Sequence, residues 1–476
     1  MSTLGQKPAT QHVSTEKQTI TGNGGTSYTL QQSVSQASDI EVFVNNTRQE
    51  PTVAYTASGK TLTMTGAVNS SDSFYVIFQG KAIQTAGLPV DAAISASTVT
   101  TSQTITSTGN ITTSGTINTP SINGGQIGGR RNIVINGAMQ VAQRSTSVTG
   151  LGDGDEGYVT VDRVRHTAAA SAGRFTSAQT AISDLPGFLN CLHLDCTTAD
   201  TSISSGELLK LEYRMEGQDV QQLKKGTADA EKVTVSFYMK TNKAFTFMCE
   251  LDDRDNNRVN TQQFTTSTSF TRHVLTFAGD TTGALDDDNA ASFAVGIYLH
   301  AGSDFTGGTY SANTWQSRAS SDNMRAVGIG SFYDSTDNDV KITGLQVEIG
   351  SQATPFEHRS FGEEIQLCQR YYFDAANSVD STFGLASAYS SSVIYGALFL
   401  PTIMRANPTM SSTTGTADYK FYRNNANDPF NSLTLSYASP ESIEYYNQDD
   451  ISGTAGHAGF IRVVGASASV ALVAEI

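Results

Sequence analysis

The residues with the clearest binding chemistry are aromatic side chains that stand beside amides and carboxylates. A sugar ring presents an apolar C–H face and a polar rim, so an aromatic ring next to such groups is suited to hold it. The candidates of this kind are Trp315, Tyr422, Tyr437, Tyr445, Tyr446 and Asn447. The alternative for each aromatic ring is packing in a core or at an interface between copies of the chain. Tyr445 and Tyr446 form the first choice, in a loop, because two adjacent aromatics flanked by Glu444 and Asn447 are hard to bury together.

Catalytic and metal-binding patterns are weak by comparison. His193 and Cys196 have the spacing of a zinc half-site, with Cys191 close by, but no second pair completes it, so this cluster is interpreted as strand interior. No Gly-x-Ser-x-Gly elbow and no phosphate-binding loop occurs. The sequence therefore predicts neither catalytic residues nor a cofactor, and it predicts a protein that is not an enzyme.

Three acidic runs are candidate calcium ligands, because Ca²⁺ prefers oxygen atoms. They cover residues 252–257, 286–289 and 334–339. The first run departs from the EF-hand pattern, since Arg258 stands at the glycine position and Phe264 at the position of the bidentate glutamate. Solvated turns are the favoured interpretation, and a structural Ca²⁺ is the alternative.

Composition narrows the functional class. The net charge is −15, with 30 Lys and Arg against 45 Asp and Glu, so the chain lacks the cationic excess that neutralises phosphates. Nucleic-acid binding is not expected. The N-terminus has no basic and apolar leader and no segment reaches the length of a membrane span, so neither a cleaved signal nor membrane insertion is expected. Four cysteines in 476 residues do not form a disulfide framework, which fits folding in a reducing cytoplasm.

Three zones of different composition divide the chain. Short alternating runs at 39–44, 60–64 and 73–78 predict a small antiparallel β domain over residues 1–86. The second zone, residues 87–129, is rich in Ser, Thr, Gly and Asn. The third zone begins at residue 130 and has the pattern of two larger β domains, over residues 130–360 and 361–476. Helix signals are sparse, and the best lies at 362–371. The expected fold class is all-β.

Isolated aliphatic residues recur every five or six positions through the Ser/Thr-rich zone. The series includes Ile105, Ile111, Ile117, Ile122 and Ile127. This period fits neither an α-helix nor a simple strand, and a single chain cannot bury such isolated side chains. Three parallel copies could bury them around a common axis, which predicts a slender trimeric β-stalk. A flexible linker is the alternative.

The N-terminal zone resembles a known kind of attachment domain. Its segment 39–49, with Tyr55 and the closing run 74–80, is similar to the N-terminal virion-attachment domains of podovirus-type tail fibres. The alternative is an unrelated small β-sandwich.

A longer resemblance covers about 240 residues of the third zone. The matching segments are 131–144, 158–163, 218–223, 233–240, 275–282, Trp315, 342–350, 353–357 and 364–372, the last containing Cys-Gln-Arg-Tyr-Tyr. In this order they are similar to the carbohydrate-binding-module-like domain of phage tail fibres. The resemblance implies a jelly-roll β-sandwich, and the alternation of Val233, Val235 and Phe237 with Thr234 and Ser236 agrees with one buried and one polar face.

The resemblances imply a bacteriophage tail fibre in the virion tail, assembled in the host cytoplasm. Such a homotrimer binds a tail or adaptor protein through its N-terminal domain, and attaches to host surface polysaccharide or lipopolysaccharide through its last domain, here expected to be a β tip. One alternative is a structural virion fibre or spacer with no receptor. Another is a tailspike that degrades capsule or lipopolysaccharide with paired carboxylates, although the long β-helical repeat of such enzymes is missing from the sequence.

Overall fold

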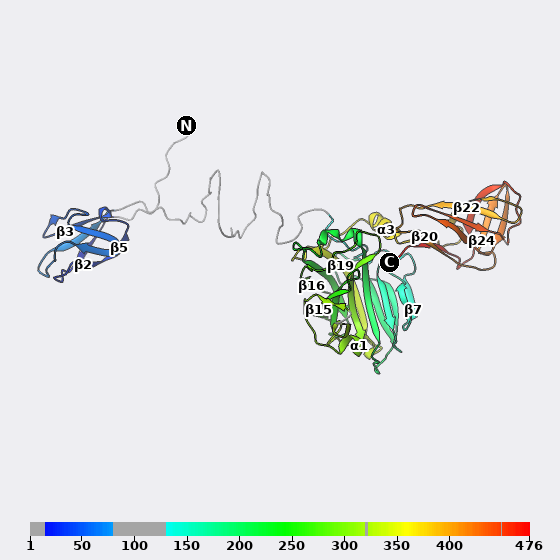
Figure 1. Ribbon diagram of the computed structural model, residues 1–476, viewed down its shortest axis with the longest axis horizontal. Coiled ribbons are helices and arrows are strands. Elements are labelled where there is room, and N and C mark those ends of the chain that lie inside the picture. The colour runs from blue at the N-terminus through cyan, green and yellow to red at the C-terminus, as the bar shows by residue number, and fades with distance from the viewer. Residues whose placement is uncertain (1–14, 80–129, 319–321, 449) are drawn as a thin grey trace, which may run out of the picture. The chain divides into compact units, whose positions relative to one another are not determined.

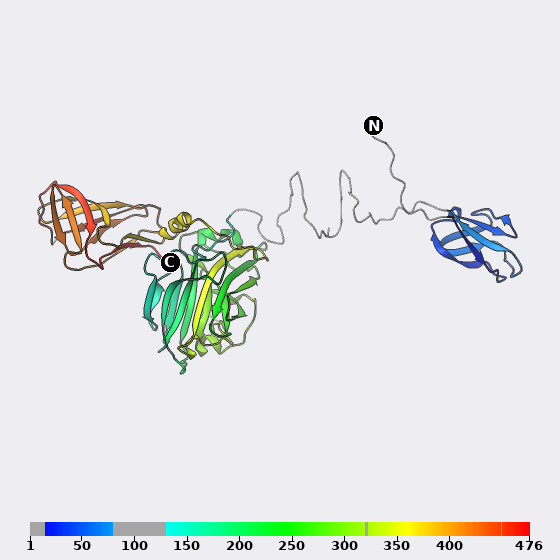
Figure 2. The same ribbon diagram turned by 180° about the vertical axis from the view of Figure 1, so that it is seen from behind.

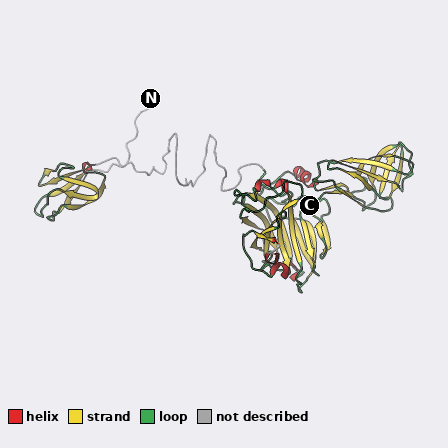
Figure 3. Ribbon diagram, viewed as in Figure 1, coloured by secondary structure: helices red, strands yellow, loops and turns green. Residues whose placement is uncertain are grey.

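The computed structural model describes residues 15–79, 130–318, 322–448 and 450–476. They belong to two compact units, one holding residues 15–79 and the other holding residues 130–476. The stalk candidates Ile105, Ile111, Ile117, Ile122 and Ile127 lie outside the described residues. Figure 3 shows that the described part of the chain is built of strands, with only short helical segments. The expected all-β class is confirmed.

The first unit is a small antiparallel β domain. One sheet has the order β1-β6-β3-β4 and the other is the pair β2-β5. Their bounds are β1 (Glu16–Ile20), β2 (Ser27–Val34), β3 (Ile40–Val44), β4 (Thr47–Arg48), β5 (Tyr55–Met64) and β6 (Phe74–Phe78), with the short 3₁₀ helix η1 (Ala37–Asp39). The buried Tyr55 of β5 links the two sheets, because its hydroxyl donates to the carbonyl of Ile40 in β3 at 2.7 Å. The strands expected near 39–44, 60–64 and 73–78 are all present.

The larger part of the second unit is a two-layer sandwich, seen from opposite sides in Figures 1 and 2. Its six-stranded sheet has the order β16-β13-β19-β11-β10-β7, and its seven-stranded sheet the order β18-β15-β14-β17-β12-β9-β8. The strands are β7 (Ser147–Leu151), β8 (Glu156–Tyr158), β9 (Arg165–Ala169), β10 (Arg174–Ala181), β11 (Asn190–Thr198), β12 (Leu208–Glu216), β13 (Val233–Thr241), β14 (Thr246–Asp253), β15 (Arg258–Thr265), β16 (Thr271–Phe277), β17 (Ala291–Ala301), β18 (Gln316–Ser317) and β19 (Asp339–Ile349). Short helices η2 (Gly217–Asp219), η3 (Gln221–Leu223), α1 (Ser303–Thr306), η4 (Asp322–Met324) and η5 (Phe332–Asp334) join them. All the strand pairings are antiparallel.

The core between these two sheets comes from alternate residues of each strand. Val233, Val235 and Phe237 point into it, as their spacing predicts. Ile342 and Leu345 of β19 also point inward, although they are three residues apart. A β-bulge in β19, where it pairs with β13, adds one residue between these two positions and so lets both side chains face the core. Gly344 lies at this bulge and has φ +65°. A side chain at position 344 would strain this left-handed conformation and approach Phe188 at 2.9 Å, so glycine is required there.

The last strands form a second, smaller sandwich, called the tip below. A three-stranded sheet has the order β20-β29-β23, and a seven-stranded sheet, the tip sheet, has the order β25-β24-β28-β21-β22-β27-β26. The strands are β20 (Tyr372–Ala376), β21 (Thr382–Ala388), β22 (Ile394–Phe399), β23 (Thr409–Ser412), β24 (Tyr419–Arg423), β25 (Ala426–Phe430), β26 (Thr434–Ala438), β27 (Ser442–Asn447), β28 (Ala458–Val463) and β29 (Val470–Val473). The tip has its own core, which includes Phe421, Ile461 and Leu472.

Helix α3 (Phe361–Gln369) precedes the tip and confirms the helix expected at 362–371. The residues after it connect the sandwich to the tip. Arg370 forms a two-pronged ion pair with Glu216 at 2.7 and 2.6 Å, and the hydroxyl of Tyr371 donates to the same carboxylate at 2.5 Å. The Cys-Gln-Arg-Tyr-Tyr segment is therefore a structural connection.

Arg163 is the buried centre of this connection. Its guanidinium lies 3.5 Å from the ring centroid of Tyr371, pairs with Glu475 at 2.6 Å and donates to the carbonyl of Arg214 at 2.7 Å. Because the side chain is only 1% exposed, its charge depends on these partners for stabilisation.

Arg163→Met is expected to lower the free energy of unfolding by about 3 kcal/mol, because it removes a hydrogen bond to the carbonyl of Arg214 and leaves the Glu475 carboxylate with Arg144 alone, at 2.9 Å. Urea unfolding followed by circular dichroism measures the loss. Arg130→Ala is the control, since Arg130 pairs with Glu363 at the surface and its loss is expected to cost less than about 1 kcal/mol. Equal effects of the two changes would contradict the role given to Arg163.

Candidate functional site

The outer face of the six-stranded sheet is polar but covered. Thr234 and Ser236 of β13 are both buried, whereas their alternation with apolar residues suggested a solvent-facing side. Thr234 donates to the carbonyl of Gly350 at 2.7 Å, and Arg272 donates both to Ser236 and to the carbonyl of Thr354. The segment after β19 thus lies against this face and leaves little of it available for a ligand.

The outer face of the seven-stranded sheet is closed by ion pairs. Glu250 of β14, fully buried, accepts two hydrogen bonds from Arg325 at 2.5 and 2.7 Å. Asp252, also buried, is bound by Arg318 at 3.0 and 3.2 Å. Lys210 lies 2.9 Å from Glu212 and 3.7 Å from Glu250. Since each buried carboxylate is paired within the chain, this face is a structural network rather than an open binding cleft.

The aromatic residues between positions 298 and 333 of the sandwich are mostly internal. Tyr298, Phe332 and Tyr333 are buried in clusters of the sandwich. Trp315 packs partly buried against the core, and its indole N–H donates to the carbonyl of Ala278 at 2.7 Å. Trp315 is therefore held as a packing residue in this structure.

The acidic runs and the cysteine cluster also have internal partners. Asp252 and Asp253 are buried in β14, so the solvated turn expected there is wrong for these two residues, and it begins only at Arg254. Asp286, Asp287 and Asp288 are exposed as expected. Among the described residues no group of three or more His, Cys, Asp or Glu side chains is placed to hold a metal ion.

Cys191 and Cys196 lie in β11, which confirms the strand-interior interpretation. Burial raises the pKa of Cys191 to about 12, so its thiol stays protonated. Neither cysteine is available as a zinc ligand or nucleophile in this state.

The tip sheet has a different outer face, because no other sheet of the tip covers it. Tyr445 and Tyr446 are consecutive in β27, so they point to opposite sides of the sheet. Tyr445 is 0% exposed and its hydroxyl donates to the carbonyl of Leu385, whereas Tyr446 faces outward and stacks on Tyr395. The prediction that Tyr445 and Tyr446 lie together in a loop is thus wrong. Asn447 points inward like Tyr445, and its amide donates to the carbonyl of Ser432 at 2.9 Å.

The β24–β25 hairpin forms one hollow on this outer face, with a volume of about 440 Å³. Tyr422 lines it, and its ring stacks on Phe460 with centroids 5.4 Å apart and an interplanar angle of 12°. Asn424 and Asn425 turn the hairpin with φ angles of +33° and +60°, a conformation that asparagine tolerates. Gly459 allows the close approach, since a Cβ there would lie 1.8 Å from the carbonyl oxygen of Tyr422.

Three exposed amides rim this hollow, from Asn424, Asn425 and Asn427. Within the described residues none of these side chains makes a hydrogen bond to the protein. A half-buried aromatic face beside unpaired amides is the combination suited to a sugar ring.

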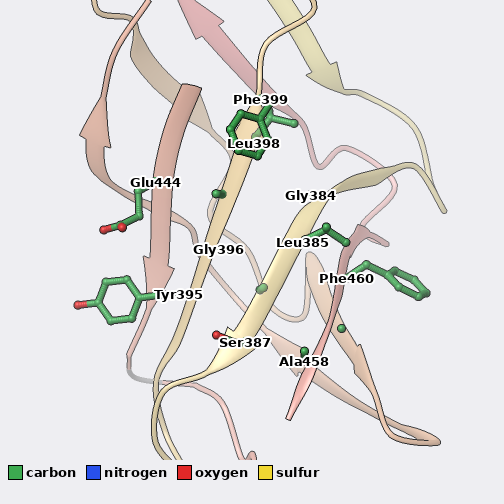
Figure 4. A pocket seen from close by; sticks show the side chains of 13 residues that line it. Gly384, Leu385, Ser387, Tyr395, Gly396, Leu398, Phe399, Glu444, Ala458 and Phe460 are labelled. Carbon is green, nitrogen blue, oxygen red and sulfur yellow. The ribbon is translucent and has the colours of Figure 1, made fainter. Parts of the chain in front are cut away.

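A second, shallow hollow of about 860 Å³ lies across β21, β22 and β28 on the same face (Figure 4). Leu385 stands in its middle, with Tyr395 on one side and Phe460 on the other. Phe399 lies at one end and is 81% exposed, while Leu385 is 71% exposed. Tyr437, on β26 at the edge of the sheet, is 75% exposed.

The structure thus keeps three of the six sequence candidates on one face, namely Tyr422, Tyr437 and Tyr446. Sequence reasoning missed Phe460, Leu385, Tyr395 and Phe399. The alternation of Tyr395, Ala397 and Phe399 with Ile394 and Gly396 was the available signal, because it gives β22 apolar side chains on both faces.

No family model and no curated protein matches the chain. Solved structures that it resembles include a family 4 carbohydrate-binding module, with 8% identity and a TM-score of 0.23 over 45% of this chain and 97% of that one. Others are a family 11 module of Clostridium thermocellum (10%, 0.21, 45% and 100%) and the enzymatically active domain of bacteriophage CBA120 tailspike protein 4 (10%, 0.23, 46% and 21%). At these values the similarity says nothing of what this chain binds.

None of the helices in the described ranges is long and apolar enough to cross a bilayer.

The ion pairs on the outer face of the seven-stranded sandwich sheet predict that the stability of the fold falls at acid pH. Burial by itself would raise the pKa of Glu212, but Lys210 and Arg214 lower it to about 2. Since the folded pKa lies below the unfolded value, Glu212 stabilises the fold above pH 4.5, and this stabilisation, about 3 kcal/mol, is lost as the pH falls toward 2.

Glu212→Gln is therefore expected to lower stability at pH 7 and to flatten the loss of stability between pH 4.5 and 2, as measured by urea unfolding at several pH values. Glu156→Gln is the control, because Glu156 is half-exposed where it pairs with Arg165. An unchanged acid dependence in the Glu212 variant would show that this carboxyl is not stabilised by its neighbours.

Proposed function

We propose that this protein is a bacteriophage tail fibre, a homotrimeric and non-enzymatic receptor-binding protein that attaches the virion to a host cell-surface glycan. The observation that carries the proposal is the β24–β25 hollow, where the stacked rings of Tyr422 and Phe460 adjoin unpaired amides. In this proposal the N-terminal β domain binds the tail or an adaptor protein, residues 87–129 form the trimeric stalk, and the tip contacts a polysaccharide or lipopolysaccharide.

Binding rather than hydrolysis is favoured by the arrangement of the carboxylates. A glycosidase needs two carboxyl groups that reach the same sugar bond from an open cleft. In the sandwich, Glu212, Glu250 and Asp252 are buried and paired with arginine or lysine. Asp428, the acid within the β24–β25 hairpin, is engaged by Arg423 at 2.6 Å.

A weak individual site suffices for attachment. Three copies on one fibre can raise the effective affinity by about 10² to 10⁴ fold over a single contact, provided that the sites engage together. This supports a shallow, solvent-facing hollow as an adhesive site.

Tyr422→Ala and Asn427→Ala are each expected to weaken binding of the full chain to host cells or their purified polysaccharide about tenfold per site, a change of about 1.4 kcal/mol. The control is Tyr75→Ala in the first unit, where Tyr75 stacks on Phe43 with centroids 4.9 Å apart. That variant has lost an equivalent stacked pair and is expected to bind normally. Normal binding by both tip variants would contradict the proposed site.

The same full chain, added in excess, is expected to block phage adsorption. A receptor-binding fibre occupies the receptor and lowers adsorption, whereas a structural fibre or spacer leaves it unchanged. The Tyr422→Ala protein should block less well than the unaltered protein at equal concentration. Release of reducing ends from the polysaccharide would instead support the depolymerase alternative.

A further inference from the structure

Most of the exposed large hydrophobic side chains among the described residues lie in the tip. There are twelve such side chains, and the seven in the tip are Val379, Leu385, Tyr389, Tyr395, Phe399, Ile403 and Tyr437. Three of them, Leu385, Tyr395 and Phe399, line the 860 Å³ hollow together with Phe460. A contiguous apolar patch of this kind marks an interaction site. Leu385 in its middle and Phe399 at its end offer no hydrogen bonds, which favours a protein surface over a sugar.

The floor of the 860 Å³ hollow allows a close approach by another sheet. Around Leu385, the outward residues Ser387 of the same strand, Ala397 of β22 and Ala458 of β28 are small, whereas Phe460 of β28 lies directly opposite Leu385. Small side chains between larger ones give a surface into which the large side chains of a partner can insert.

Opposite charges flank this hollow. On the β24–β28 side, Lys420 and Arg462 are directly opposite each other in the strand register. On the β22–β27 side stand Glu444, which lines the hollow, and Glu441, the exposed residue that precedes β27. A second copy whose acidic flank meets this basic flank would therefore match both charge and apolar surface.

Within the described residues the basic flank is only partly compensated, by Asp380 and by the rings of Tyr422 and Phe460, whose centroids lie 4.7 and 5.2 Å from the Arg462 guanidinium. Two cations directly opposite on adjacent strands repel each other. Lys420 takes part in none of the ion pairs of the described residues, and Nε of Arg462 is buried without a hydrogen-bond partner there. Asp380 lies 3.7 Å from Arg462 but is mostly exposed, so it offsets the repulsion only in part. Carboxylates from another copy would remove this cost.

We infer that the outer face of the tip sheet over β21, β22 and β28 is a self-association interface, in which the Lys420–Arg462 flank of one copy meets the Glu441–Glu444 flank of the next. The occupant is a second copy of this chain. The inference rests on the proposed function only in taking the number of associated copies to be three. Such an interface would bring Tyr437 and Tyr446 of one copy toward the Tyr422 hollow of its neighbour, so that three sequence candidates from opposite halves of the sheet adjoin one site.

The test uses a reporter thiol in the full chain. All four native cysteines are buried, so Ser387→Cys introduces an accessible thiol at the centre of the face. A short bifunctional maleimide is expected to cross-link copies of this variant, as seen on a reducing gel. Ser411→Cys, on the exposed side of β23 in the other sheet, is the control and should react without cross-linking.

Further substitutions in the Ser387→Cys variant test the apolar contact and the charge pairing separately. Leu385→Glu is expected to reduce cross-linking at least fivefold, because it places a charge in the apolar centre. Arg462→Glu should also reduce it, and combining it with Glu444→Arg should restore it, since the reversed charges match again. Failure of the double variant to recover would overturn the charge pairing.

Labelling of the Ser387→Cys variant without cross-linking would overturn the interface. If host polysaccharide then protects that thiol from labelling, the face is a glycan site instead. Cell binding by Tyr422→Ala is measured independently of cross-linking, so the failure of the interface can be told from the failure of the proposed receptor site.

Discussion

The alternation of side chains along a β-strand governs this structure. Each strand sends every second residue into a core, and the remaining residues need solvent, a covering segment or a partner. In the sandwich, other segments of the same chain cover much of the outer faces, and buried charges there are paired, as Glu250 is with Arg325. In the tip, the outer face of the seven-stranded sheet has no such covering sheet. The contrast directs attention to the tip as the surface available for recognition.

Pairing is what allows the sandwich to bury so many polar groups. A carboxylate removed from water is unstable unless a cation and hydrogen bonds replace its hydration. Glu212, Glu216 and Glu250 each have arginine partners, and Glu216 connects the sandwich to the tip through Arg370. Because the carboxylates of this network are already paired with arginine side chains, they have little capacity to bind a ligand. The same groups would be catalytic candidates only if they faced an open cleft.

The sequence predicted the fold class and many strands, because alternation and turn residues are local signals. It placed strands near 39–44, 73–78 and 233–240, and it placed the helix near 362–371. It could not tell which face a tyrosine occupies when the strand limits were unknown, so Tyr445 and Tyr446 were assigned to one loop. It could not show that Asp252 and Asp253 lie within a strand, because their partners Arg318 and Lys225 are distant in the sequence. The aromatic hollow at Tyr422 depends on Phe460 from another strand, which local pattern does not reveal.

In the proposed function, the Tyr422 hollow of the tip meets the host, and the closed face of the sandwich does not. Hydroxyl-radical footprinting of the full chain, with and without host surface polysaccharide, tests it residue by residue. The account predicts that the polysaccharide protects Tyr422 and Phe460. The reactivity of Trp315 and of Tyr310, a partly buried sandwich residue whose hydroxyl accepts from the backbone N–H of Gln263, stays the same. Protection of the sandwich residues with no change at Tyr422 and Phe460 would contradict it.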